Sequence, residues 1–168
     1  MKAFTPADAD EIYGAVTADI TQYLSWEKPA SFEAFSTSWK RWLSNMEAGT
    51  HVSLVVRSRS SSKFVGMLGL HGISITAEPE VGIWIRENAQ NRHYGREAIG
   101  ALIEWAFRTL QLKSVSYPVV DENAPSRRLV ESLNGYVVGH RTHKKSETVE
   151  HRLVIYRIPT RLAANAAQ

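Results

Sequence analysis

The sequence contains no cysteine. Disulfide bonds, thiolate metal sites and a cysteine nucleophile are therefore excluded, so any covalent chemistry would need another side chain. Long apolar runs are also missing: residues 1–4 lead directly into a helix-start signal, without the stretch that a signal peptide or a membrane span requires. We therefore expect a cytoplasmic protein with no membrane partner.

Metal ligands and a strong charge of one sign are scarce as well. The histidines His71, His140, His143 and His151 lack the spacing of a metal site, so no metal is expected. The net charge is +3 and the isoelectric point is about 9.3, which suits an anionic small ligand but falls short of a nucleic-acid-binding protein. The basic residues are scattered rather than clustered in one run.

The composition indicates one compact α/β domain. The chain has 168 residues, of which 43% are hydrophobic and 22% charged, enough to bury a continuous core. We expect a single domain over residues 1–168, with a frayed tail at about 163–168.

Two helices are predicted in the N-terminal part. Thr5 can serve as an N-cap and Pro6 suits the first helical position, which predicts a helix over 5–18. After an aromatic loop at 23–26, Ser31 can cap a second helix that ends at Gly49. One face of this helix is apolar and is expected in the core, including Phe32, Phe35, Trp39, Trp42, Leu43 and Met46.

The middle of the chain alternates between strand and helix patterns. Alternating apolar residues predict a hairpin of two strands, one from His51 and one from Phe64, followed by a third strand over 81–85. A strand over 114–120 lies far enough downstream to run parallel to the third, with a crossover helix between them. The buried stripe of that helix comprises Ala98, Ile99, Leu102, Ile103, Ala106, Phe107 and Leu110.

The C-terminal part predicts a short helix and two more strands. The helix covers 125–133 and ends at Asn134-Gly135, and the strands lie at about 136–141 and 152–158. The predicted order is two helices, three strands, a helix, a strand, a helix and two strands. This order indicates an α/β fold with a mixed sheet.

Three segments resemble, in order, the GNAT superfamily of N-acetyltransferases, particularly the ribosomal-protein-alanine N-acetyltransferase branch. Residues 80–85 (EVGIWI) are similar to an acidic residue followed by the IGYWL strand of that branch. Residues 90–95 (QNRHYG) resemble its pyrophosphate loop, Q/R-x-x-G-x-G/A, and residues 123–126 (NAPS) with Gly135-Tyr136 resemble its N-x-x-S…G-F element. The N-terminal aromatic loop also fits, whereas an initial strand before Thr5 is short or missing.

The resemblance implies a GNAT fold, in which two parallel central strands splay apart and admit the pantetheine arm of acetyl-CoA. It implies that Ser126 protonates the departing CoA thiolate, while Glu80, at the mouth of a central strand, is our candidate for orienting or deprotonating the acceptor amine. Taken from the residues alone, Ser126 can equally be a first-turn residue and Glu80 a solvated strand end. The expected cofactor contacts are Ile83, Ile85, Gln90, Asn91, Arg92, His93, Tyr94, Gly95, Arg96 and Asn123.

Two residues bear on how the cofactor would fit. His93 replaces the first glycine of the family loop, and a positive φ there would cost about 1 kcal/mol, which a histidine tolerates and a β-branched residue does not. Pro118 lies inside a predicted strand and cannot donate to a ladder, so its partner there is absent or distant, or the strand is an edge. Tyr23 and Trp26, which lie on a loop, are expected to wall an acceptor pocket, although packing over the sheet also explains them.

The predicted function is transfer of an acetyl group from acetyl-CoA to a primary amine, on a peptide or a small molecule, by direct attack and without a metal. Nothing in the chain pairs a nucleophile with a base, which argues against a covalent intermediate. The alternatives are a catalytically silent CoA-binding regulatory domain, suggested by His93, and a nucleic-acid-binding module, suggested only by the basic isoelectric point. A homodimer is the default assembly.

Overall fold

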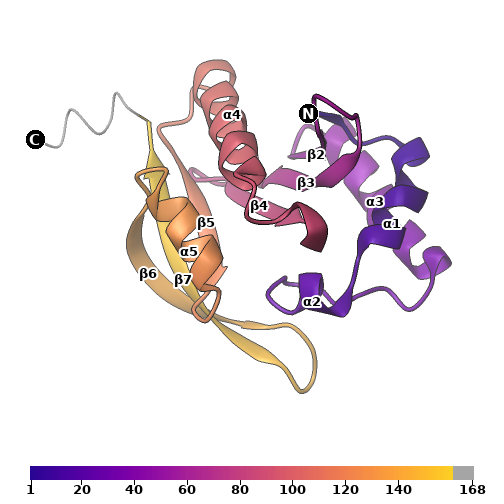
Figure 1. The fold of residues 1–168 in the computed structure, drawn as a ribbon. Helices are drawn as coiled ribbons and strands as arrows, with labels where there is room; N and C mark the ends of the chain where they lie inside the picture. The colour runs from indigo at the N-terminus through magenta and orange to yellow at the C-terminus, as the bar shows by residue number, and fades with distance from the viewer. Residues whose placement is uncertain (161–168) are drawn as a thin grey trace, which may run out of the picture.

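The computed structural model describes residues 1–160, so the tail expected at 163–168 lies outside the described residues. Seven strands form one sheet in the order β1-β2-β3-β4-β5-β7-β6 (Figure 1). All neighbouring strands are antiparallel except β4 and β5, which confirms the predicted mixed sheet and its parallel central pair. The strands are β1 Lys2–Ala3, β2 His51–Arg57, β3 Phe64–His71, β4 Glu80–Ile85, β5 Ser114–Val120, β6 Tyr136–Lys144 and β7 Glu150–Pro159.

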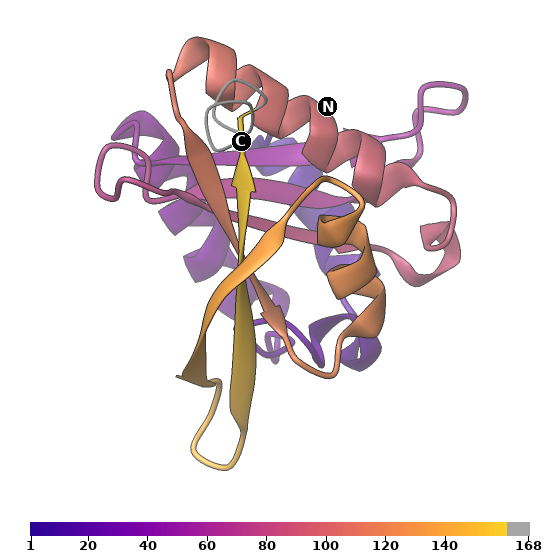
Figure 2. The same cartoon turned by 90° about the vertical axis from the view of Figure 1, so that its left-hand side faces the viewer.

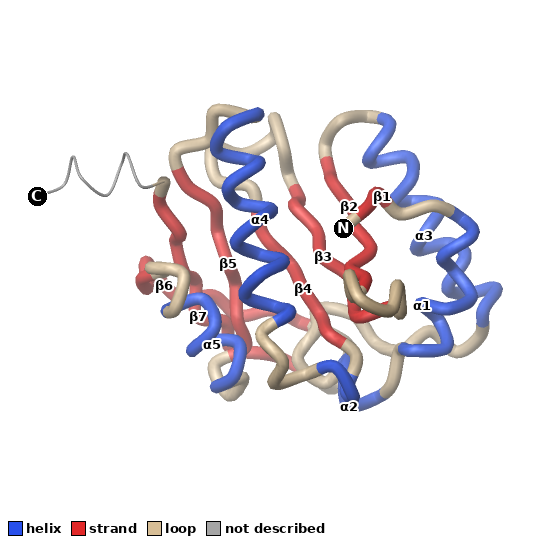
Figure 3. The backbone as a smooth tube through the Cα atoms, turned by 45° about the horizontal axis from the view of Figure 1, so that its top comes forward, coloured by secondary structure: helices blue, strands red, loops and turns tan. Residues whose placement is uncertain are grey.

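Helices cover both faces of the sheet (Figures 1 and 3). One face carries α4 and α5, and the other carries α1 and α3. Consecutive residues of β3 show the two faces clearly, because Leu68 packs in the core under α4 whereas Met67 packs in the core with Phe35 of α3. The helical elements are η1 Pro6–Asp8, α1 Ala9–Ala15, α2 Ala18–Thr21, α3 Phe32–Glu47, η2 Glu87–Ala89, α4 Tyr94–Thr109 and α5 Ala124–Glu131.

The predicted caps and stripes are found in α3 and α4. The Ser31 side chain accepts a hydrogen bond from the Ala34 N–H at 3.1 Å, and Gly49, with φ +69°, follows the end of α3. The buried residues of α4 are Ala98, Ile99, Leu102, Ile103 and Ala106, and the remaining two residues of the predicted stripe pack partly buried against the same core.

The prediction of one helix over 5–18 is wrong at its end. Helix α1 stops at Ala15, and Val16 has extended backbone with ψ 118°. Thr17 then caps a separate short helix, α2, by accepting a hydrogen bond from the Ile20 N–H at 3.2 Å. A local side-chain cap therefore outcompetes continuation of the first helix, and the break redirects the chain toward the aromatic loop.

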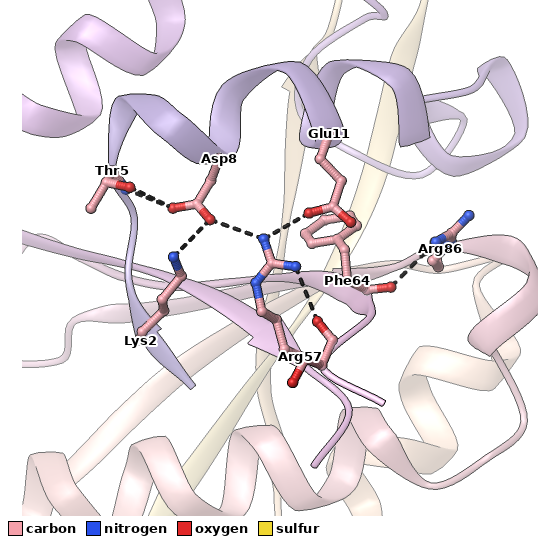
Figure 4. Close-up of polar contacts among 8 residues, drawn as sticks. Lys2, Thr5, Asp8, Glu11, Arg57, Phe64 and Arg86 are labelled. Atoms are coloured by element: carbon pink, nitrogen blue, oxygen red, sulfur yellow. Dashed lines mark hydrogen bonds and ion pairs between the residues drawn. The ribbon is translucent and has the colours of Figure 1, made fainter. Parts of the chain in front are cut away.

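A buried carboxylate joins the N-terminus to the sheet (Figure 4). Asp8 is only 2% exposed and lies 2.9 Å from the Lys2 ammonium and 3.0 Å from the Arg57 guanidinium. It also accepts hydrogen bonds from the backbone N–H and the hydroxyl of Thr5, and Arg57 binds Glu11 as well. Burial alone would raise the pKa of Asp8, but the hydrogen bonds from Lys2, Thr5 and Arg57 outweigh it and hold the pKa well below its usual range.

Candidate active site

Strands β4 and β5 begin side by side and then diverge. Within residues 1–160, Glu80 and Ser116 are the single register pair between them, and the Ser116 N–H donates to the Pro79 carbonyl at 3.0 Å. Because alternate residues of a strand face the same neighbour, the next β5 residue facing β4 is Pro118, which has no N–H to donate. The ladder therefore stops where the sequence predicted a missing partner for Pro118. Figure 2 shows the strands of the C-terminal half crossing steeply over those of the N-terminal half.

The edge of β4 presents backbone groups to this opening. The Arg86 N–H donates to the Val65 carbonyl of β3 at 2.9 Å, so alternation directs the N–H groups of Ile83 and Ile85 toward β5. The Ile85 carbonyl accepts a hydrogen bond from the Gln90 side chain at 3.0 Å. The N–H groups of Ile83 and Ile85 thus face the opening, where β5 has diverged from β4 and does not pair with them.

A cavity of about 420 Å³ occupies the opening and joins the two faces of the sheet. It brings together six of the predicted site residues: Tyr23, Trp26, Glu80, Ile83, Asn123 and Ser126. Ile85 and residues 90–96 do not line it. The cavity walls also include residues that the sequence did not single out for the site, among them Trp42, His71, Trp84, Tyr117, Arg141, His143 and His151.

The predicted pyrophosphate loop lies beside the cavity, at the N-terminus of α4. Asn91 and His93 both have positive φ, at 58° and 62°, and His93 occupies the N-cap position of the helix. A Cβ atom added to Gly95 would lie 3.3 Å from the Leu129 side chain of α5 and 3.9 Å from the side chains of Ile83 and Ile85. The first turn of α4 therefore packs directly over the β4 edge, and its N–H groups and dipole favour an anion there.

The charged side chains of this loop are exposed beside the N-terminus of α4. Arg92 lies over the Tyr94 ring at 5.4 Å, and the Arg96 guanidinium is 3.4 Å from the Ser132 carbonyl at the end of α5. Both arginines and His93 are exposed. Two guanidinium groups and a left-handed loop thus border the place that the sequence assigns to a pyrophosphate.

The left-handed conformation of His93 predicts a selective sensitivity to substitution. His93→Gly is expected to change the free energy of unfolding by less than about 1 kcal/mol and to retain CoA affinity, because glycine adopts positive φ freely. His93→Val is expected to lower the free energy of unfolding by about 1 to 2 kcal/mol and to weaken CoA binding. Urea denaturation and calorimetric titration measure both effects. Arg92→Val, at an exposed position without a positive φ, is the matched control for stability, and equal losses of unfolding free energy in the two valine variants would contradict the prediction.

Ser126 forms a hydroxyl pair with a residue that sequence reasoning missed. The Ser126 Oγ lies 3.1 Å from the Tyr117 Oη, and the Ser126 N–H donates to the Asn123 side chain at 3.1 Å. Tyr117 is 3% exposed, and its burial raises its pKa to about 12, so the phenol stays protonated at neutral pH. The sequence places Tyr117 directly before Pro118, but this position does not show that the Tyr117 ring points toward α5.

Glu80 faces two basic groups on the other side of the cavity. Its carboxylate forms an ion pair with Arg141 of β6 at 2.9 Å, with a second contact at 3.3 Å. His71 pairs with Glu80 in the β3–β4 register and lies over Gly69 and Gly82, where a Cβ atom would come within 2.7 Å and 3.3 Å of its ring. Burial and the neighbouring His51 lower the pKa of His71, against an opposing effect of Glu80. The lowered pKa favours the neutral form of the His71 imidazole.

Metal-binding clusters and membrane-spanning helices are both missing from the part of the chain that the structure describes. Among these residues, no three or more histidine, aspartate or glutamate side chains gather as a metal site would require. Over the same range, none of the helices combines the length and the apolar character needed to cross a bilayer.

Comparisons with known proteins place the chain among acetyltransferases. The model of the acetyltransferase (GNAT) domain matches residues 1–135, and the chain therefore belongs to the GNAT acetyltransferase family, as the sequence predicted. No curated protein matches the sequence.

Solved structures share the fold across nearly the whole chain. A spermidine N-acetyltransferase from Vibrio cholerae, in complex with CoA and spermine, has a TM-score of 0.81 at 19% identity, covering 94% of this chain and 93% of its own. A proposed ribosomal-protein-serine acetyltransferase from Vibrio cholerae has a TM-score of 0.76 at 18% identity, covering 94% and 91%. The GNAT fold predicted from the sequence is thus confirmed.

Proposed function

We propose that this GNAT protein transfers the acetyl group of acetyl-CoA to a primary amine by direct attack. The observation that carries the proposal is the cavity in the β4–β5 opening, because it places Glu80 and Ser126 in the walls of one space. A carboxylate for the amine and a hydroxyl for the leaving group are the two functions that such a transfer needs.

The N-terminus of α4 and the open edge of β4 are the proposed binding surface for CoA. Residues 90–96 would hold the pyrophosphate through the first N–H groups of α4, with Arg92 and Arg96 adding positive charge. The Ile85 N–H, at the edge of β4 outside the cavity, would pair with a pantetheine amide, as strand neighbours do. The Asn123 oxygen is already used by Ser126, so its amide nitrogen is the group that would donate to pantetheine.

The proposed chemistry has four proton or charge movements. The amine loses a proton to Glu80, directly or through water, and its nitrogen forms a bond to the carbonyl carbon. The Ile83 N–H, in the cavity wall, stabilises the oxyanion, and collapse of this intermediate breaks the carbon–sulfur bond. Ser126 then gives its proton to the sulfur, with Tyr117 holding the Ser126 hydroxyl in position, and water returns the proton from Glu80 to Ser126.

The acceptor is proposed as a peptide N-terminus or a small-molecule amine. Spermidine and spermine enzymes among the similar structures support small-molecule amines as a class. An α-amine, with a pKa of about 7.7 to 8.0, would need little help from Glu80, whereas a lysine amine, near 10.4, would need more.

Calorimetric titration and a free-thiol assay test the proposal together. We expect the protein to bind acetyl-CoA and to release CoA thiol when a panel of peptides, amino acids, polyamines and simple amines is added. Binding without thiol release across the whole panel would instead favour a silent CoA-binding domain, the alternative that His93 suggested. If acetyl-CoA does not bind at all, the proposal is wrong.

A further inference from the structure

The β6–β7 hairpin lies across the acceptor side of the cavity and contacts the N-terminal half of the chain. Three basic residues at alternate positions of this hairpin make the contacts. Arg141 binds Glu80 of β4, His143 lies 3.3 Å from the Ser25 carbonyl, and the Lys145 ammonium donates to the Thr21 carbonyl at 2.5 Å. Arg141 therefore reaches past β5 and β7 to a carboxylate on the far side of the opening.

The charges in the cavity wall are balanced rather than acidic. Glu80 is the single carboxylate among the described residues that line it, and Arg141 is the single guanidinium. The other titratable wall residues near them are His71, His143 and His151, and the two tyrosines Tyr23 and Tyr117. A polyamine carries several positive charges and needs several carboxylates, so this wall does not suit one.

We propose that Glu80 and Arg141 together bind an amino-carboxylate acceptor, the ammonium group on Glu80 and the carboxylate on Arg141. This inference rests on the proposed function and names its acceptor class. The two side chains are half-exposed, at 38% and 50%, so the pair opens at little cost when an acceptor replaces both contacts. The planar guanidinium fork matches a carboxylate with two parallel hydrogen bonds.

The rest of the wall suggests the side chain of such an acceptor. Trp26, Trp42 and Trp84 line the same cavity, with Tyr23 beside them. Large aromatic walls favour an apolar group of the ligand, while a few charged groups fix its orientation. The acceptor class is therefore an amino acid with an aromatic or large aliphatic side chain.

Matched acceptors test the inference on the full-length protein with acetyl-CoA. Phenylalanine and phenethylamine differ only in the carboxylate, and spermidine supplies a polycation. We expect kcat/KM for phenylalanine to exceed that for phenethylamine by about tenfold or more, with spermidine the poorest of the three. Equal use of the first two, or a preference for spermidine, would overturn the inference.

The second part of the experiment uses variants of Arg141. In Arg141→Gln, kcat/KM for phenylalanine should fall about 10- to 100-fold, mainly through KM, because the carboxylate loses its charged partner. In the same variant, kcat/KM for phenethylamine should rise, because the Glu80 carboxylate is no longer neutralised by a guanidinium. Arg141→Lys should give kcat/KM values between those of the wild type and Arg141→Gln. Arg108→Gln is the control, since Arg108 also belongs to an exposed ion pair, with Glu104 on α4, but lies outside the cavity wall.

The results separate this inference from the proposed function. If Arg141→Gln changes kcat/KM for both acceptors in the same direction, the inference is wrong even though transfer to amines stands. Acetylation of phenethylamine or spermidine without acetylation of phenylalanine would likewise overturn the inference but leave the proposed function standing. Failure of the wild-type protein to acetylate any amine would remove the proposed function and the inference with it.

Discussion

Replacing Ser126 with alanine is expected to lower kcat by about 100-fold or more and to leave acetyl-CoA affinity nearly unchanged. The departing thiolate would lose its proton donor, and general acid catalysis typically contributes about 10²- to 10⁴-fold. The Ser126 N–H, which binds Asn123, is retained in the variant, so the start of α5 should keep its geometry. Steady-state thiol release measures kcat, and calorimetric titration measures the affinity.

Two further variants show whether a loss of kcat in Ser126→Ala comes from the Ser126 hydroxyl itself. Ser132→Ala removes a hydroxyl from the end of the same helix, where it donates to the Leu129 carbonyl outside the cavity, and should leave kcat unchanged. Tyr117→Phe removes the hydroxyl that contacts Ser126 and should cause a smaller loss. Unchanged turnover in Ser126→Ala would remove Ser126 from the mechanism, and a larger loss in Tyr117→Phe would transfer its role to the phenol.

Replacing Asp8 with alanine is expected to lower the free energy of unfolding by about 2 to 3 kcal/mol at pH 7. The buried carboxylate accepts charged hydrogen bonds from Lys2 and Arg57 and two more hydrogen bonds from Thr5. Because Lys2 and Arg57 are partly exposed, water compensates them after the change and limits the loss. Glu11→Gln, which removes the exposed partner of the same Arg57, should cost less than about 0.5 kcal/mol.

The Asp8 contribution should also depend on pH. Its folded pKa lies well below the ordinary value of 3.8, so the stabilisation is fully present above that value. As the pH falls below 3.8, the unfolded chain takes up the proton first, and the contribution declines toward the folded pKa. Urea denaturation at several pH values should therefore show the difference between wild type and Asp8→Asn shrinking below pH 3.8. A difference that stays constant down to about pH 2 would contradict the prediction.

Local signals explain why much of the fold was predictable. Ser31 and Gly49 mark the ends of α3 through contacts within a few residues, and β5 matches its predicted bounds at both ends. Pro118 carried information beyond its own position, because a missing N–H limits pairing wherever the strand lies. The end of α1 was missed because Thr17 acts as a cap for α2, and the same residue could equally continue a helix.

The cavity wall was predictable only in part. Glu80, Asn123 and Ser126 were found because they lie in segments with a family pattern. His71 and Arg141 belong to strands whose register and curvature depend on partners far along the chain, and no local pattern places both against Glu80. Tyr117 was missed for a related reason, because its contact with Ser126 requires that α5 fold back over β5.

The divergence of β4 from β5 means that the sheet is incomplete in the protein alone. Its two halves share one register pair in the described chain, and donors at Ile83 and Ile85 face the space between them. In the proposed function, the amides of the pantetheine chain would complete the ladder there in place of a neighbouring strand, whereas a free acyl group has no amides with which to do so. In this protein the same missing backbone pairing that weakens the middle of the sheet would select the acyl donor.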